Sequence, residues 1–408
     1  MAYKGDRYVE EERRRRWPVA AATPQLYLLG LGGLAAPRGV ARRLRTRRSS
    51  TPRSSRLARL AIAPSAAAGG LGMSSGRPVE RMVVIGLSNI GDGILMAPVI
   101  AQLHARYPKA RLTLFVGERA RQVYVNDPRV HQLLSFDQYS GWWGRLRLVA
   151  AIWRLRPDGF VDLRNTLLPM VVKPWVFWRY VWPVPARLAH RRDRHLWKLS
   201  QQLPGGVLVD EQGNGAVLPL LAQEHTHTQQ LLQRAGIRSD RALVVICPGA
   251  RSELKRWPAD RFAAVADSLI EHENVTVLLS GEPDEAPIID EIRHAMRHQA
   301  MSMVGRLTIR QTAALMSRAR LVITNDSASL HVACAMHVPV LALFGPTDAK
   351  KYGPTGPQDR VIRRRLFCAP CEQALCRFNH ECLRFIGVDE VIESATEMLR
   401  APAVVVHG

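Results

Sequence analysis

The sequence lacks any long apolar run free of charge, so no transmembrane helix is predicted. The aromatic-rich run Thr166–Val184 is interrupted by charged residues and prolines, and the apolar segment Gln25–Ala36 is too short to span a bilayer. No clean signal peptide surrounds that segment. Cysteine is also scarce, with 6 in 408 residues, which argues against a disulfide-rich scaffold.

Acidic residues are few relative to basic ones. The chain has 35 Asp and Glu against 57 Lys and Arg, a net charge of +22. Residues 1–80 hold 16 of the basic and 5 of the acidic residues, which is half of the excess. A basic excess favours an anionic partner, such as a phosphorylated substrate, a membrane surface or nucleic acid, and does not choose among them.

Residues 1–80 are of low complexity, with arginine clusters at 13–16 and 42–48. Such a segment buries too little apolar surface to offset the entropy of ordering, so a disordered basic extension is predicted. One interpretation is an arm that binds nucleic acid or anionic lipid. The other, which we favour, is a mis-assigned start, with the protein beginning at Met73 or Met82.

From Met82 onward, strand patterns alternate with helix patterns. Met82–Leu87 is a continuous apolar run, typical of a strand buried on both faces of a parallel sheet. Further strands are predicted at 111–116, 130–136, 159–163, 243–247, 275–280, 321–324 and 338–344. Helices are predicted at 93–107, 118–125, 142–154, 259–271, 285–298, 308–317 and 327–337. This alternation indicates two doubly wound α/β domains, 81–205 and 241–400, joined by a linker region 206–240.

The run GLSNIGDG, residues 86–93, ends the first strand and opens a helix, where backbone N–H groups favour an anion. It lacks the Lys-Ser/Thr pair of a Walker A loop, so it is not a Walker A loop. It is also not G-x-G-x-x-G, which argues against a dinucleotide-binding fold for hydride transfer. Asp92 has two interpretations. It is either a general base facing the ligand or a cap of the helix.

Two motifs of the second domain lie at strand ends. In CPGARSELKRWP, residues 247–258, Lys255 and Arg256 are suited to neutralising a diphosphate, although a solvated basic loop fits equally well. In TNDSASLH, residues 324–331, small residues let a ligand approach the backbone, and His331 is interpreted as a packed, hydrogen-bonded residue rather than a catalyst. The run FGPT, residues 344–347, ends another strand on the same edge.

Together these segments resemble glycosyltransferase family 9, the bacterial heptosyltransferases of lipopolysaccharide core synthesis. The resemblance covers roughly residues 82–400. It implies a GT-B fold, in which two Rossmann-like domains face across a cleft, and an inverting, metal-independent mechanism without a cofactor. The donor would be ADP-heptose, held mainly by the second domain, and the acceptor a lipid-linked, phosphorylated core sugar.

The resemblance also assigns roles to residues. Asp92 would be the base that deprotonates the acceptor, and Lys255 would stabilise the leaving diphosphate. The implied donor-binding residues are Ser252, Lys255, Glu282, Asp326, Ser327, Ala328 and His331. The implied loop on the acceptor and phosphate side contains Ser88, Asn89 and Gly91. The family usually has glycine where this chain has Ala328, and this departure bears on the identity of the donor.

Four cysteines lie within residues 368–382, spaced Cys368-x2-Cys371-x4-Cys376-x5-Cys382, with His380 nearby. The spacing alone is compatible with a zinc or iron–sulfur site. The second pair is not spaced like a standard knuckle, however. We therefore favour a stabilised cysteine-rich loop or a reversible disulfide, with no metal.

An aromatic-basic stretch at residues 175–182 fits either a membrane-surface segment or a helix packed on the first sheet. These observations predict a cytoplasmic enzyme, with peripheral contact at the inner face of the inner membrane as an open extension of that prediction. A family 9 transferase with another sugar nucleotide or glycan acceptor remains the first alternative. A nucleic-acid-binding protein acting through the N-terminal arm is the alternative of a different class.

Overall fold

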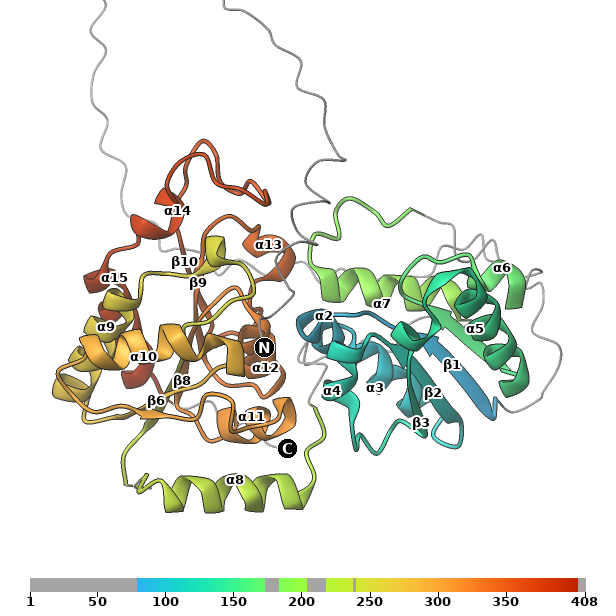
Figure 1. The fold of residues 1–408 in the computed structure, drawn as a ribbon, viewed down its shortest axis with the longest axis horizontal. Coiled ribbons are helices and arrows are strands. Elements are labelled where there is room, and N and C mark those ends of the chain that lie inside the picture. The colour runs from blue at the N-terminus through green and yellow to red at the C-terminus, as the bar shows by residue number, and fades with distance from the viewer. Residues whose placement is uncertain (1–78, 173–182, 204–217, 238–239, 403–408) are drawn as a thin grey trace, which may run out of the picture. The chain divides into compact units, whose positions relative to one another are not determined.

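The computed structural model describes residues 79–172, 183–203, 218–237 and 240–402, all within the unit Leu60–Gly408. They form two parallel sheets flanked by helices (Figure 1), so the predicted α/β class is confirmed. The N-terminal arm and the aromatic-basic stretch 175–182 lie outside the described residues. Within the described ranges, no helix combines the length and the apolar character needed to cross a bilayer.

The first domain has a four-stranded sheet in the order β3-β2-β1-β4, with every pair parallel. Its first elements are β1 (Arg81–Ile85), α2 (Ile90–Leu95), α3 (Ala97–Arg106), β2 (Arg111–Val116), α4 (Glu118–Tyr124) and β3 (Gln132–Ser135). They are followed by the 3-10 helix η1 (Phe136–Tyr139), α5 (Gly141–Leu155), β4 (Gly159–Asp162), α6 (Leu168–Val172) and α7 (Arg191–Gln202).

The single helix expected at 93–107 is wrong, because the chain forms α2 and α3 with Met96 between them. Pro98 is the physical reason. It has no N–H to donate to the preceding turn, and its ring crowds the carbonyl four residues earlier. At the start of a new helix both penalties vanish. The break lets α2 keep its own direction, with its first turn directly after the 86–89 loop.

The second domain has a six-stranded parallel sheet in the order β10-β9-β8-β5-β6-β7. Its helices and turns up to α11 are η3 (Glu253–Lys255), α9 (Ala259–Glu273), η4 (Pro283–Glu285), α10 (Ala286–Ala295) and α11 (Ile309–Met316). The later ones are α12 (Ala328–Ala335), α13 (Ala349–Tyr352), α14 (Glu381–Arg384) and α15 (Val388–Arg400). The strands are β5 (Leu243–Cys247), β6 (Thr276–Leu279), β7 (Met301–Ser302), β8 (Leu321–Asn325), β9 (Val340–Phe344) and β10 (Arg360–Arg363).

The linker region 206–240 contains a helix that its composition does not predict, α8 (Ala222–Arg234), which packs on α11. A buried ion pair holds it there. The Arg310 guanidinium donates to the Glu224 carboxylate, with Nε 2.5 Å from Oε1, and also to the carbonyl oxygen of Val123 at 3.2 Å. One arginine therefore joins the connecting helix, the second domain and α4 of the first domain.

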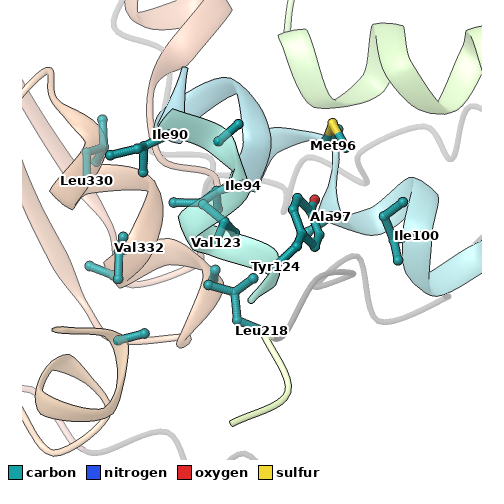
Figure 2. Packing of buried hydrophobic residues seen from close by; sticks show 14 of the residues in the cluster. Ile90, Ile94, Met96, Ala97, Ile100, Val123, Tyr124, Leu218, Leu330 and Val332 are labelled. Carbon is teal, nitrogen blue, oxygen red and sulfur yellow. The ribbon is translucent and has the colours of Figure 1, made fainter. Parts of the chain in front are cut away.

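A single buried apolar cluster includes residues of both domains (Figure 2). Ile90 and Ile94 of α2 and Leu330 and Val332 of α12 belong to it, and α2 and α12 are in contact. All four side chains are nearly or fully buried. The cluster therefore holds together the two helix starts that carry the predicted site residues.

Candidate functional site

The first-domain part of the site is the turn from β1 into α2. Asn89, not Asp92, is the N-cap residue of α2, so the capping interpretation of Asp92 is wrong. Asp92 lies in the first helical turn and is half-buried, and its Oδ2 accepts a hydrogen bond from the Asn89 side-chain amide at 3.1 Å. The Asp92 carboxylate is therefore oriented by its neighbour and keeps lone pairs for a further partner.

Asn89 is itself held by the second domain. Arg251, in the loop after β5, donates from Nη1 to Asn89 Oδ1 at 3.0 Å. The acceptor is the amide oxygen, so the amide nitrogen points to Asp92. A hydrogen-bonded chain thus runs from Arg251 through Asn89 to Asp92. The sequence prediction missed Arg251, although it lies inside the 247–258 motif and only the basic pair further along was singled out.

Gly91 lies against His331 of α12. A Cβ added at Gly91 would stand 2.8 Å from the His331 ring carbon Cδ2, so any larger residue would displace the ring or the helix. His331 is buried, and burial, opposed by the charges of Asp326 and Asp92, lowers its pKa to about 4. The ring is therefore neutral near pH 7. It packs against Gly91 of the first domain, which confirms the packed part of the sequence interpretation.

Lys255 and Asp326 form an ion pair at the second-domain part of the site. Lys255 Nζ is 2.7 Å from Asp326 Oδ2, and Thr347 Oγ1 donates to the same oxygen at 2.6 Å. Asp326 is 6% exposed and Lys255 31% exposed. The Asp326 carboxylate thus positions the ammonium, which retains N–H donors for an anion. Thr347, in the predicted FGPT turn, is a residue whose role the sequence did not assign.

Asn325, just before Asp326, is fully buried and ties two loops together. Its Nδ2 donates to the carbonyl oxygen of Pro248 at 2.6 Å, and its Oδ1 accepts from the Trp257 backbone N–H at 3.2 Å. Trp257 is fully buried and stacks edge-on against Phe262 at 5.0 Å. These contacts fix both ends of the loop that carries Lys255.

The start of α12 is suited to an anion. Ser327 is the N-cap residue in an extended conformation, but its side chain accepts no capping hydrogen bond. Its hydroxyl lies 3.2 Å from Thr324 Oγ1 instead. The first-turn N–H groups therefore receive no acceptor from Ser327, and they lie beside the half-buried Ala328. Ser252 similarly precedes η3 without capping it by its side chain.

Two predicted residues pair with arginines. Glu282 Oε2 accepts from Arg119 Nη2 of α4 at 2.7 Å, so a nucleotide sugar that uses this carboxylate would have to share or displace that arginine. Ser88 Oγ accepts from Arg164 Nη1 at 2.8 Å. Arg119 and Arg164 were both missed by sequence reasoning. For Arg164 the signal was its position just after the carboxyl end of β4.

The cysteine-rich loop lies beside the FGPT turn. All six cysteines of the chain are free thiols in the structure, and those at 368, 371, 376 and 382 line a cavity of about 460 Å³ with His380. The Cys371 backbone N–H donates to the carbonyl oxygen of Pro346 at 3.0 Å. In the described part of the chain, no three His, Cys, Asp or Glu side chains are grouped so as to hold a metal ion.

Comparison with known proteins identifies proteins that are similar to this chain. Residues 209–381 match the family model described as glycosyltransferase family 9 (heptosyltransferase). The lipooligosaccharide heptosyltransferase 2 of Haemophilus ducreyi is 26% identical over 322 residues, which cover 69% of this chain and 88% of the relative.

Two solved structures share the fold. The glycosyl transferase family 9 structure from Veillonella parvula has a TM-score of 0.69 at 23% identity and covers 79% of this chain and 98% of its own. The E. coli ADP-heptose lps heptosyltransferase II has a TM-score of 0.61 at 23% identity, with coverages of 78% and 98%. The architecture is therefore GT-B, with two Rossmann-like domains.

Proposed function

Because the chain belongs to glycosyltransferase family 9, we propose that it transfers heptose from ADP-heptose to the inner core of lipopolysaccharide. The observation that carries this proposal is the hydrogen-bonded chain that joins the two domains, from Arg251 of the second domain through Asn89 to the Asp92 carboxylate of the first. Asp92 lies in the first turn of α2, and Lys255 lies in the loop after β5, where it is paired with Asp326 just before α12. Gly91, next to Asp92, lies against His331 of α12. Relatives named as heptosyltransferases support the choice of sugar and acceptor.

Asp92 takes the proton of the acceptor hydroxyl in the proposed reaction. The acceptor oxygen then attacks the anomeric carbon of the heptose while the bond from that carbon to the diphosphate oxygen breaks, with inversion of configuration. The chain Arg251–Asn89–Asp92 keeps the carboxylate in a fixed direction. A base whose orientation is fixed before the substrate arrives loses less entropy in the transition state.

The leaving diphosphate gains negative charge as the bond breaks, and cationic groups stabilise it. Lys255, held by Asp326, supplies a localised positive charge, and the start of α12 supplies backbone N–H donors. These groups serve in place of a divalent cation in the proposed mechanism. Ser252, Glu282, Ser327 and Ala328 are proposed to contact the donor, and Ser88, Asn89 and Gly91 to lie on the acceptor and phosphate side.

Turnover with defined substrates tests the proposal. Purified protein is incubated with ADP-heptose and Kdo-lipid A or heptosylated core, and ADP release and the mass of the lipid product are measured, with and without a chelator. Asp92→Asn keeps the shape of the side chain and should abolish transfer. Asp290→Asn, which alters an exposed ion pair on α10, is the matched control and should leave transfer intact.

Transfer from UDP- or GDP-sugars but not from ADP-heptose would replace the proposed donor while keeping the reaction class. Full turnover by Asp92→Asn would remove Asp92 as the base. We propose that the enzyme acts at the cytoplasmic face of the inner membrane, because a lipid-linked core acceptor is anchored there.

A further inference from the structure

An exposed apolar surface covers α5 and α6 of the first domain. The two helices are in contact and neighbours in Figure 1. Its members are apolar side chains that are 45% to 71% exposed, and we call this set the α5–α6 face. They are Trp142, Trp143, Leu146 and Trp153 on α5 and Leu167, Met170 and Val171 at α6.

The inner side of α5 is already packed, so the outer apolar residues are not its core-facing stripe. Ile152 is buried, and Leu148 and Leu155 pack with it against the apolar cluster of the first sheet. Trp142, Leu146 and Trp153 follow one another by 4 and 7 residues, which places them on one separate side of the helix. The helix thus carries two apolar stripes, and the described structure covers only one of them.

Positive charge borders this face without compensation. Arg145, Arg147 and Arg154 of α5 are exposed, and α5 and α6 contain no acidic residue. Within the described ranges, no ion pair involves any of these three arginines. Each guanidinium therefore presents an unneutralised charge beside exposed indole rings.

We propose that the α5–α6 face docks on an anionic lipid bilayer. The indole rings lie at the level of the headgroups, where amphipathic aromatic rings are favoured, and the arginines bind lipid phosphates. Charge selects this occupant over a second copy of the chain. In a symmetric dimer through this face, the uncompensated arginines of one copy would meet those of the other.

The face has a short connection to the site. Arg164, which donates to Ser88 Oγ, precedes the first residue of α6 by only a few positions. The loop that carries Asp92 and the docking face therefore belong to the same domain and share the segment after β4. The inference deepens the proposed function and rests on it for its purpose, since a lipid-linked acceptor requires the enzyme at a membrane.

Binding is tested with the full chain and without turnover. The protein is sedimented with phosphatidylcholine vesicles that contain or lack phosphatidylglycerol. The arginine variant Arg145→Gln/Arg147→Gln/Arg154→Gln should weaken binding to the anionic vesicles by roughly 100-fold, because each cation near the surface contributes about a fivefold factor. Trp142→Ser/Trp153→Ser should weaken it at least about tenfold.

Matched controls separate the face from general exposure. Phe367→Ser/Leu375→Ser removes two apolar side chains on the second domain, which are 87% and 83% exposed, and should not change binding. Every variant retains residues 1–78, so unchanged binding in the arginine and tryptophan variants would assign vesicle affinity elsewhere and overturn the proposal. Loss of a dimer in the tryptophan variant, seen by sedimentation velocity without vesicles, would also overturn it.

Transfer to a delipidated, water-soluble acceptor separates this proposal from the proposed function. The docking variants should retain that transfer while losing vesicle binding. Vesicle binding that follows the α5–α6 face without any sugar transfer would leave the docking surface standing and remove the proposed reaction. Sugar transfer without vesicle affinity would support the proposed reaction and remove the docking surface.

Discussion

The pair Lys255–Asp326 should act as one unit in catalysis, and replacing either member tests this. Lys255→Met removes the charge offered to the leaving diphosphate. Asp326→Asn keeps that charge but removes the carboxylate that positions it, which lies 2.7 Å from the ammonium. A hydrogen bond to a charged group contributes about 1.5–3 kcal/mol, so losing the positioning should lower kcat by roughly 10- to 100-fold.

The size of the effect follows from the two exposures. Asp326 is 6% exposed and cannot exchange Lys255 for water, whereas Lys255 is 31% exposed and can turn into solvent when its partner is neutral. The free energy of unfolding should therefore change little while kcat falls. Lys255→Met should lower kcat by about 100-fold or more, as expected when a preorganised group on developing charge is lost.

The assay is steady-state ADP release at saturating acceptor, with kcat and donor KM measured for both single variants and the double variant. Because Asp326 acts through Lys255, the double variant should be no slower than Lys255→Met alone. Thr347→Val is the matched control. It removes the other hydrogen bond to the same carboxylate oxygen and should cost only a few-fold in kcat. Multiplicative losses in the double variant, or a fully active Asp326→Asn, would refute the reasoning.

Three further predictions concern His195, Gly91 and Ala328. Burial lowers the pKa of His195 to about 3, and its ring nitrogens have no hydrogen-bond partner among the described residues. The folded protein therefore resists protonation of this ring, so the free energy of unfolding is highest above pH 6.5 and falls toward pH 3 by at most about 1.4 kcal/mol per pH unit. His195→Leu should flatten the slope of the free energy of unfolding, measured with urea, against pH. Gly91→Ala should lower Tm by several degrees and His331→Ala in the same chain should restore part of it, because the added methyl meets the His331 ring; no restoration would place the clash elsewhere. Ala328→Gly should lower the donor KM if the methyl group crowds the phosphate, and an unchanged or higher KM would contradict that.

Strands were the most predictable part of the fold. The bounds predicted at 111–116 and 243–247 are those of β2 and β5, because short runs rich in apolar and β-branched residues, RLTLFV and LVVIC, are typical of buried parallel strands. The helix α8 was missed because its sequence is mostly polar, and it is held by the buried pair of Glu224 with Arg310. That pairing joins residues far apart in the chain, so no local sequence pattern predicts it.

The candidate site was predictable where a strand end met a helix start. That rule identified Asp92, Lys255 and the start of α12. Lys255 pairs with Asp326 just before α12, and Gly91, next to Asp92, lies against His331 of α12. It did not identify Arg251, whose partner Asn89 lies 162 positions away in the other domain. Contacts between domains depend on how the two sheets meet, and a single sequence carries no periodic signal for that.

The apolar cluster shared by α2 and α12 limits how far the protein can be divided. Ile90 and Ile94 on one side and Leu330 and Val332 on the other belong to one buried cluster, and their helices α2 and α12 are in contact. Either half produced alone would expose this surface to water at a cost of about 25 cal/mol per Å² of apolar area, which favours aggregation. The proposed base and the proposed leaving-group cation come from different domains, and the shared cluster makes these domains poor candidates for separate production. Recombining halves from related enzymes should therefore succeed only when the α2 and α12 surfaces are exchanged together.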